Sequence, residues 1–514
     1  MLVDLSNLPS PDWLLALPQL IVLGLAIVLL LADAFVPARN HYTLLTTLSI
    51  VGYAAAMASL WFVDGKNATT FWWLFRADGL SVFLCLAILL AALLTIFVSA
   101  SYVDRLEGRM PIGEYYVLLA LSTLGALLVA AAGDLVVIFI GIELSSLAVY
   151  VLTAFAKRRA TAVEGAMKYF LLGIFASAIL VYGMAWIYGQ TGSTNLDFIA
   201  QALASADAGG SLTEPSLLLA LLLLVVGLGF KMAAVPFHFW TPDAYDGAPT
   251  PVTAFMSVVP KAAAFAATIR ILVQALGPMQ GEWLNLIAVL ALLTMALGNI
   301  VAISQRNVKR MLAYSSIAHT GYIMVGLAAY RTETGFIGAG SGDQGVAAVL
   351  YYLFAYAVMN VGAFGLVAWL QHRGRGMTLD DFSGLASSQP LAAAAMTVFM
   401  LSLMGIPPTI GFYAKYRVIV AAIDSGTVGL ALSIGIVVLS AVSAFYYLRV
   451  VAVMYFNEPI HLPRKTSTPL LNVGLAAMAI GSLLGGVFFA GDVFALAERW
   501  YRALTVLAQV GIGG

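Results

Sequence analysis

Charged residues are scarce in this chain. Only 10% of its 514 residues are Asp, Glu, Lys or Arg, whereas 62% are hydrophobic. Soluble domains carry about 25% charged residues, so lipid must solvate most of this chain. Its 25 basic and 25 acidic residues cancel, which leaves no net positive charge to attract a nucleic acid. The composition therefore indicates a protein of the lipid bilayer with no nucleic-acid partner.

Cysteine and histidine are also nearly absent. Cys85 is the single cysteine, which excludes an internal disulfide, a Cys-ligated zinc site and an iron–sulfur cluster held by this chain. No two histidines stand four residues apart, as a haem or metal site on one helix requires. The five are His41, His238, His319, His372 and His461. We expect neither a metal nor a redox cofactor in this chain.

Hydrophobic runs of about 20 residues, the length that crosses a bilayer, recur throughout the sequence. Asp4 and Asp12 precede the first run, which is longer than a signal-peptide core, so we expect it to remain as a span. The sequence predicts an all-α polytopic membrane protein. About fourteen spans are expected, near 13–36, 42–63, 79–102, 113–132, 135–156, 164–189, 215–236, 253–276, 284–303, 309–329, 345–370, 391–422, 429–455 and 469–490.

These spans are expected to form two inverted repeats of five helices, with the seventh and twelfth spans broken. The tail from Val493 to Val510 carries Glu498 and Arg499 on an apolar stretch, which is typical of a segment along the membrane surface. The predicted segments are 1–110 with three helices, 111–276 and 284–455 with one repeat each, and 469–514 with the last span and the tail.

Lys and Arg gather in alternate loops. Because the basic side of a membrane protein faces the cytoplasm, we expect both termini on the periplasmic side of a bacterial inner membrane. One set of loops holds Arg39, Arg105, Arg109, Lys157, Arg158, Arg159, Arg306, Lys309, Arg310, Arg373, Arg375, Arg464 and Lys465. The other set holds Lys66, Arg76, Arg331, Arg499 and Arg502.

Seven cationic residues remain inside the spans or at their ends. A charge at the bilayer centre costs at least ~2.5 kcal/mol, so it persists only where it is paired, hydrated or used. Lysine suits proton transfer, because desolvation lowers its pKa and a neighbouring carboxylate raises it. The seven are Lys168, Lys231, Lys261, Arg270, Lys415, Arg417 and Arg449.

Glu143 is the deepest carboxylate, nine residues beyond Asp134. It is the expected acidic partner of the lysines, although nearby Ser145 and Ser146 also offer it a structural role. Lys168 has a second interpretation, because Glu164 lies four residues before it and the two could form an ordinary helical ion pair.

Prolines interrupt two spans beside lysines. Lys231 lies five residues before Pro236, and Lys415 follows Pro407 and Pro408. A proline inside a helix frees backbone carbonyls, which makes a polar pocket for a buried ammonium group. Lys261 directly follows Pro260. Lys415 also lies near a span end, where a lysine can reach toward the membrane surface.

Two longer motifs resemble a known family. The run from Phe230 to Ala254 (FKMAAVPFHFWTPDAYDGAPTPVTA) and the run from Lys309 to Tyr322 (KRMLAYSSIAHTGY) are similar to the antiporter-like subunits of proton-pumping NADH:quinone oxidoreductase and of multisubunit cation/proton antiporters. The resemblance covers about residues 75 to 455. Three features resemble the N-type branch: the run 351–364 (YYLFAYAVMNVGAF), a lysine at position 415, and no long helix after the last span.

The resemblance implies proton translocation coupled to electron transfer from NADH to quinone. Glu143, Lys168, Lys231, Lys261 and Lys415 match the proton-path positions of the family. His319 and Tyr314 are possible relays, although His319 could equally be a packing residue, and His238 is expected to orient the broken span. The basic residue that some relatives carry in the eleventh span is absent, and Asn360 is the nearest polar group.

The same resemblance implies partners. We expect FMN and iron–sulfur clusters in partner subunits, and M-type and K-type membrane-arm subunits as neighbours. The competing interpretation is a cation/proton antiporter subunit without any link to electron transfer. An assembly scaffold fits poorly with five intact ionisable positions, and a quinone-binding enzyme would need a redox ligand set that this sequence does not provide.

Overall fold

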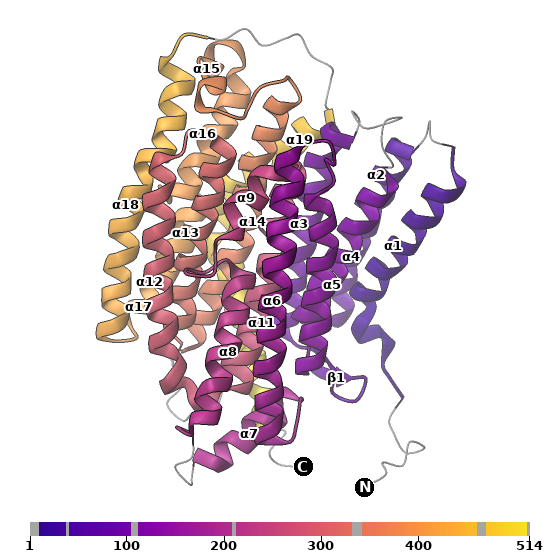
Figure 1. Ribbon diagram of the computed structural model, residues 1–514, viewed down its shortest axis with the longest axis vertical. Coiled ribbons are helices and arrows are strands. Elements are labelled where there is room, and N and C mark those ends of the chain that lie inside the picture. The colour runs from indigo at the N-terminus through magenta and orange to yellow at the C-terminus, as the bar shows by residue number, and fades with distance from the viewer. Residues whose placement is uncertain are drawn as a thin grey trace.

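The computed structural model is a bundle of long helices that run roughly parallel to one another (Figure 1). It describes residues 10–37, 41–103, 112–207, 212–330, 342–459 and 469–510. Each of the fourteen predicted spans coincides with a helix or with an interrupted helix. The unbroken long helices are α1 (Leu17–Phe35), α2 (His41–Val63), α3 (Gly79–Val103), α4 (Gly113–Ala130), α5 (Leu135–Thr153), α6 (Ala160–Thr191), α12 (Gln280–Ser304), α13 (Val308–Ala328), α14 (Gly342–Gln371) and α18 (Thr427–Phe456).

The other spans are interrupted. They are α8 (Pro215–Met232) with α9 (Trp240–Gly247); α10 (Thr250–Met256) with α11 (Val259–Thr268) and the π-helical η4 (Ile269–Ala275); α16 (Pro390–Met404) with α17 (Ile410–Ile423); and α19 (Pro469–Leu484) with η7 (Gly485–Phe489) and α20 (Ala490–Val510). Short elements connect them: η2 (Trp13–Ala16), β1 (Ala68–Thr70), β2 (Phe75–Ala77), α7 (Leu196–Asp207), η5 (Gly277–Met279), η6 (Leu379–Phe382) and α15 (Leu385–Ser388).

Within the described ranges, twelve helices are long and apolar enough to cross a membrane. The all-α polytopic architecture is therefore confirmed. The other two predicted spans do not meet this criterion of length and hydropathy, and the reason for each can be identified. Polar residues make α13 less apolar, and the break between Met404 and Ile410 divides α16 from α17. Both still lie in the bundle, because α13 packs on α12 and α14, and α17 packs on α14 and α18.

The antiparallel strands β1 and β2 form a small hairpin in which Ala68 pairs with Ala77. The hairpin lies at the lower end of the bundle in Figure 1, and α15 lies at the upper end. We call these the hairpin end and the α15 end. The first described residues belong to the hairpin end, since the Asp12 amide donates to Thr70 Oγ1 at 2.8 Å.

The C-terminal helix differs from the prediction. Through Tyr501, α20 does not lie along the membrane surface but continues α19 across the bundle, packing on α3 and α14. A buried stripe explains the difference, because Phe494, Ala497 and Tyr501 face the interior. Gly79, at the start of α3, lies against the Trp500 backbone, where a Cβ atom would meet the carbonyl oxygen at 2.0 Å. The charges near 498 suggested a surface segment, yet the apolar face decides its position.

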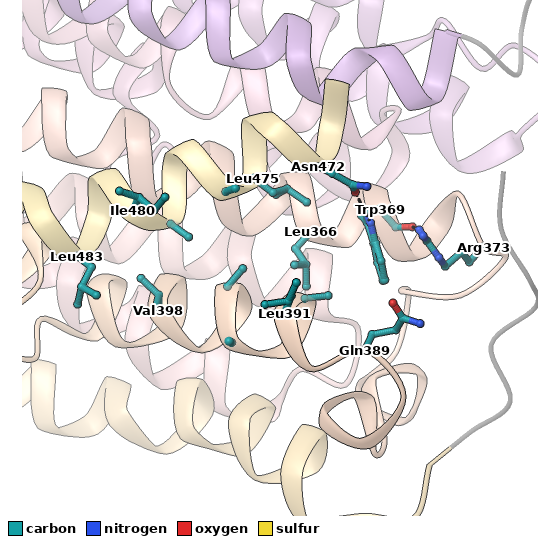
Figure 2. A pocket seen from close by; sticks show the side chains of 15 residues that line it. Leu366, Trp369, Arg373, Gln389, Leu391, Val398, Asn472, Leu475, Ile480 and Leu483 are labelled. Atoms are coloured by element: carbon teal, nitrogen blue, oxygen red, sulfur yellow. Dashed lines mark hydrogen bonds between the residues drawn. The ribbon is translucent and has the colours of Figure 1, made fainter. Parts of the chain in front are cut away.

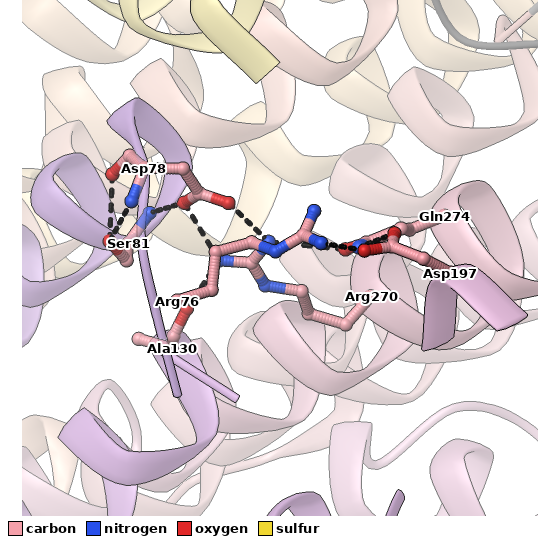
Figure 3. A network of polar contacts seen from close by, with 7 residues as sticks. All are labelled: Arg76, Asp78, Ser81, Ala130, Asp197, Arg270 and Gln274. Atoms are coloured by element: carbon pink, nitrogen blue, oxygen red, sulfur yellow. Dashed lines mark hydrogen bonds and ion pairs between the residues drawn. The ribbon is translucent and has the colours of Figure 1, made fainter. Parts of the chain in front are cut away.

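A buried cluster of charged side chains ties the hairpin to the bundle (Figure 3). Arg270 of η4 is fully buried and donates to the two oxygens of Asp78 at 2.6 and 2.8 Å and to the Ala130 carbonyl at 3.0 Å. Asp78 also accepts the Ser81 amide at 2.8 Å, which caps the start of α3. Such a pair is stable only because each charge has several polar partners.

The cluster continues from the hairpin to α7. Arg76 of β2 pairs with Asp197, and Gln274 donates to the other Asp197 oxygen at 2.9 Å. Gln274 also accepts from Arg270 at 3.1 Å. Arg76 is therefore a buried cation, not the loop charge that the sequence indicated.

Removing one member of the buried pair should destabilise the protein. Arg270→Met leaves an ionised Asp78 without its cation, which costs about 3–5 kcal/mol. We expect a clearly lower midpoint of thermal denaturation for the purified protein. Adding Asp78→Asn should restore most of the loss, because Asn is neutral and still caps α3.

Arg375→Gln is the matched control, because Arg375 is 46% exposed in its ion pair with Asp381 and exposed pairs contribute little. A double variant as unstable as Arg270→Met alone would show that the charge of Asp78 is not the cause.

Candidate functional site

Glu143 and Lys231 form an ion pair inside the bundle. Asp134 caps the start of α5 by accepting the Val136 amide at 2.7 Å, and Glu143 follows in the middle of that helix. Lys231 Nζ, on α8, lies 2.9 Å from Glu143 Oε1 and 3.2 Å from Ser146 Oγ. Ser177 of α6 donates to the same carboxylate oxygen at 2.5 Å. The predicted acid and a predicted lysine are therefore direct partners.

The break after α8 places Lys231 at a helix end. Ala233 has a left-handed backbone (φ +62°), and Pro236 has no amide hydrogen to continue the helix. The freed carbonyls find new donors: the Trp240 indole binds the Phe230 carbonyl at 3.2 Å, and Thr320 Oγ1 binds the Met232 carbonyl at 3.0 Å. The carbonyl end of a helix carries partial negative charge, which favours the Lys231 ammonium group.

Among the described residues, Lys261 has no carboxylate as a hydrogen-bond partner. The side chain lies on α11, almost wholly buried, and Nζ donates to the Ser316 carbonyl at 2.8 Å and to Ser316 Oγ at 2.6 Å. The Tyr356 ring lies 5.6 Å from Nζ, within the range of a cation–π contact. Neutral oxygens and an aromatic ring therefore solvate this group in place of water.

Thr320 connects the surroundings of the two lysines. Its hydroxyl lies 3.0 Å from the Met232 carbonyl, next to Lys231, and 3.2 Å from the Ser316 carbonyl. The Ser316 carbonyl also accepts from Lys261 Nζ. One turn of α13 thus bridges the end of α8 to Lys261.

His319 lies one turn beyond Ser316 on α13 and is almost fully buried. Its Nδ1 is 2.7 Å from the Tyr352 hydroxyl and its Nε2 is 3.2 Å from the Tyr447 hydroxyl. Tyr447 in turn lies 2.5 Å from Ser315 Oγ. Both ring nitrogens therefore have hydroxyl partners, each able to donate or accept a proton.

The second broken helix repeats the arrangement around Lys415. Its α16 half ends at Gly405, whose backbone is left-handed (φ +87°). Lys415 Nζ donates to the Met404 carbonyl at 2.8 Å and to Ser440 Oγ at 3.0 Å. Nζ also lies 4.6 Å from the centre of the Tyr322 ring. Lys415 is buried and does not reach toward the membrane surface.

One face of α13 joins these groups. Ser316, His319 and Tyr322 are spaced by three residues, so they line one side of the helix. Ser316 contacts Lys261, Tyr322 contacts Lys415, and His319 lies between them. This face therefore places polar or aromatic side chains from Lys261 to Lys415.

Three predicted residues lie elsewhere. Lys168 is 44% exposed and pairs with Glu164 and Asp243, each at 2.7 Å, so the i, i+4 pair that the sequence allowed does form. Tyr314 is five residues from His319, about 140° around α13, and so points away from the polar face. His238 lies in the break between α8 and α9 and stacks on Phe239.

Asn360 and Lys309 are buried polar residues with structural partners. Asn360 is fully buried and donates to Ser257 Oγ at 2.6 Å. Lys309 was expected in a loop, but it lies in the first turn of α13, fully buried, and binds the carbonyls of Asp246 and Ala248 at the end of α9.

The sequence did not single out the neutral groups that complete the site. They share a hydroxyl or phenol on a membrane helix, and they are Ser177, Ser316, Thr320, Tyr352 and Tyr447. Only the spacing of Ser316, Thr320 and Tyr322 in the α13 motif gave a signal. In the part of the chain that the structure describes, no three His, Cys, Asp or Glu side chains gather as a metal site would need.

The chain belongs to the NADH:quinone oxidoreductase/Mrp antiporter family of transmembrane proteins, whose family model matches residues 132–443. Its resemblance to the N-type branch is also confirmed. The sequence is 45% identical to "NADH-quinone oxidoreductase subunit N 2" of Roseiflexus castenholzii over 487 residues, which cover 93% of this chain and 94% of that protein.

Solved structures agree with this assignment. A chain of respiratory complex I from Thermus thermophilus with bound aureothin is 33% identical, with a TM-score of 0.75 over 94% of this chain and 99% of that one. A chain of the Mrp complex from Dietzia sp. DQ12-45-1b is 22% identical, with a TM-score of 0.80 over 97% and 98%. At that identity the second likeness shows a shared fold.

A methyl group at position 405 should disturb the Lys415 site. Gly405→Ala would place a Cβ atom 2.9 Å from Lys415 Cδ and force alanine into the left-handed region, which costs about 1–2 kcal/mol. We expect a lower denaturation midpoint for the purified protein.

The matched control is Gly24→Ala, in the interior of α1 with no atom within 4 Å of the new methyl group. It should be neutral or slightly stabilising. Equal midpoints for the two variants would contradict the account of the helix break.

Proposed function

We propose that this chain is the proton-translocating subunit N of a NADH:quinone oxidoreductase. The observation that carries the proposal is the burial of Lys231, Lys261 and Lys415 beside one polar face of α13. Buried ammonium groups held mainly by neutral oxygens can lose and regain protons at little cost, because no fixed carboxylate locks Lys261 or Lys415 in the charged form.

The proposed transfer begins at the ion pair. Glu143 stabilises protonated Lys231 while the two lie 2.9 Å apart. A change transmitted from the redox subunits separates them, and Lys231 then gives its proton to neutral Lys261 through water. The proton passes by His319 to Lys415, which releases it on the far side of the membrane. Lys231 then takes up a proton from the uptake side and pairs with Glu143 again, so each cycle moves one proton and returns every group to its starting state.

Lys168 is proposed to act on the uptake side of this path. Asp243 binds Lys168 of α6 at 2.7 Å and Arg310 of α13 at 2.8 Å. Since Asp243 lies on α9, the half-helix that follows Lys231, a change in the charge of Lys168 would act on the same broken helix. His238, in the break itself, is proposed to orient α9, and Tyr314 is a relay only by way of water.

The electron-transfer chemistry is proposed to reside in partner subunits, which would hold FMN and the iron–sulfur clusters, while this chain carries no redox centre. M-type and K-type membrane-arm subunits are its proposed neighbours. We place it in a bacterial inner membrane with both termini periplasmic. Basic residues in connections at the α15 end, among them Lys157, Arg306 and Arg375, support a cytoplasmic location for that end.

We further propose that 111–276 and 284–455 are inverted repeats. Each contains a helix that is broken beside a lysine at a left-handed residue, Ala233 or Gly405. A multisubunit cation/proton antiporter remains the alternative function, and the subunits that purify with the native protein distinguish the two. NADH-oxidising and iron–sulfur subunits would support subunit N.

Disrupting the ion pair should stop proton transfer without preventing assembly. Glu143→Gln and Lys231→Ala each remove one charge of the pair. We expect proton pumping by the purified complex in proteoliposomes to fall at least about tenfold. That fall corresponds to an activation barrier of the limiting step that is higher by about 1.4 kcal/mol or more. Assembly is followed by the amount of intact complex, and Arg375→Gln is the control. Normal pumping in an assembled Glu143→Gln complex would reject the mechanism.

If His319 relays protons, removing the hydroxyl of Tyr352 should lower the rate of proton pumping. Tyr352→Phe removes the group 2.7 Å from His319 Nδ1 but keeps the ring. We expect a several-fold lower pumping rate, since the imidazole loses the partner that sets its orientation and tautomer.

Tyr351→Phe is the matched control, because Tyr351 is equally buried and its hydroxyl bonds to no other described residue. If both variants pump at the wild-type rate, His319 is a packing residue.

A further inference from the structure

A groove opens between α14, α16 and α19 of the bundle (Figure 2). Its volume is about 710 Å³, within the range of small-molecule sites. The groove begins near the α15 end, and none of Lys231, Lys261 and Lys415 lines it. The proposed proton path therefore does not account for it.

The groove is polar at one end. Arg373 follows the end of α14, and its guanidinium lies 3.4 Å from the centre of the Trp369 ring. Arg373 Nη1 donates to the Trp369 carbonyl at 2.9 Å, and the Trp369 indole donates to Asn472 of α19 at 3.0 Å. The Gln389 amide joins them at this end in Figure 2. Packing on Trp369 fixes the position of a cation in the groove wall.

The rest of the groove is lined by apolar side chains, several of them small. Ala395 and Ala476 are among its lining residues. Ile480 and Leu483 lie at the far end from Arg373 (Figure 2). Small side chains on facing helices leave a slot that the protein does not fill. Ile480 is 56% exposed and Leu391 86%, so this apolar surface needs a hydrocarbon neighbour.

We propose that the groove binds a glycerophospholipid, with one acyl chain along α16 and α19 and the phosphate at Arg373. The charges are complementary, since a guanidinium carries the positive charge that attracts a phosphate. The depth also fits, because Arg373 stands at the end of a membrane helix, where headgroups begin.

Photolabelling of the assembled complex tests the proposal. The purified complex is placed in phosphatidylcholine vesicles that contain a little phosphatidylglycerol with a diazirine at the end of one acyl chain. After illumination, mass spectrometry should find label on the α16 and α19 residues that line the groove. The phosphatidylglycerol probe should label these residues more strongly than a phosphatidylcholine probe with the same diazirine. The reason is that phosphatidylglycerol carries a net negative charge, which favours binding at Arg373.

Two variants, each with a matched control, distinguish lipid binding in the groove from lipid binding to the rest of the surface. Arg373→Gln should reduce labelling about fivefold, the loss expected for one basic residue at the membrane surface, whereas Arg375→Gln should not. Ala476→Phe should block the slot, whereas Ala477→Phe should not, because Ala477 is exposed on α19 outside the groove.

Equal labelling in wild type and Arg373→Gln would overturn the proposal. So would an equal loss in Arg375→Gln, or a helix of another subunit seated in the groove of the native complex. The label is read without turnover, so this result is independent of whether the chain pumps protons.

Discussion

A buried ammonium group needs oxygen atoms around it, and an unbroken membrane helix has few to offer. Everything in the centre of this protein follows from that constraint. The breaks after Met232 and Met404 release backbone carbonyls at mid-bundle, and the Met404 carbonyl binds Lys415 directly. Side-chain hydroxyls supply the remaining oxygens, as Ser316 does for Lys261. Within the described part of the chain, Lys231 is the one of these three buried lysines with a carboxylate partner, which sets it apart from Lys261 and Lys415.

The helix α13 gives these separate sites a common wall. It carries the oxygen ligands of Lys261, the aromatic ring beside Lys415, and the hydroxyl that binds the carbonyl end of α8. The same polar residues lower its hydropathy, so a helix at the centre of the site looks least like a membrane span. Packing against α12, α14 and α17 compensates for the low hydropathy of α13, because neighbouring protein can accept polar side chains that lipid cannot.

Much of this arrangement could be predicted from the sequence, for physical reasons. Hydropathy located the helices, prolines located the breaks, and the scarcity of charge made Glu143 and the lysines conspicuous. Neutral hydroxyls such as Thr320 gave little signal, because serine and threonine are common in membrane helices as local backbone partners. The Asp78–Arg270 pair was missed because its members are 192 residues apart and Asp78 lies at a span boundary. The position of α20 depended on its apolar face, not on the charges around Glu498.

The geometry of α13 has an electrical consequence. From Ser316 to Tyr322 the helix rises only about 9 Å, roughly a third of a hydrocarbon core of about 30 Å. Charge carried along this face from Lys261 to Lys415 therefore crosses only part of the membrane thickness. The transmembrane voltage does work only on displacement along the membrane normal. It would thus act more on the steps that bring a proton in from one aqueous phase and release it to the other than on the internal step.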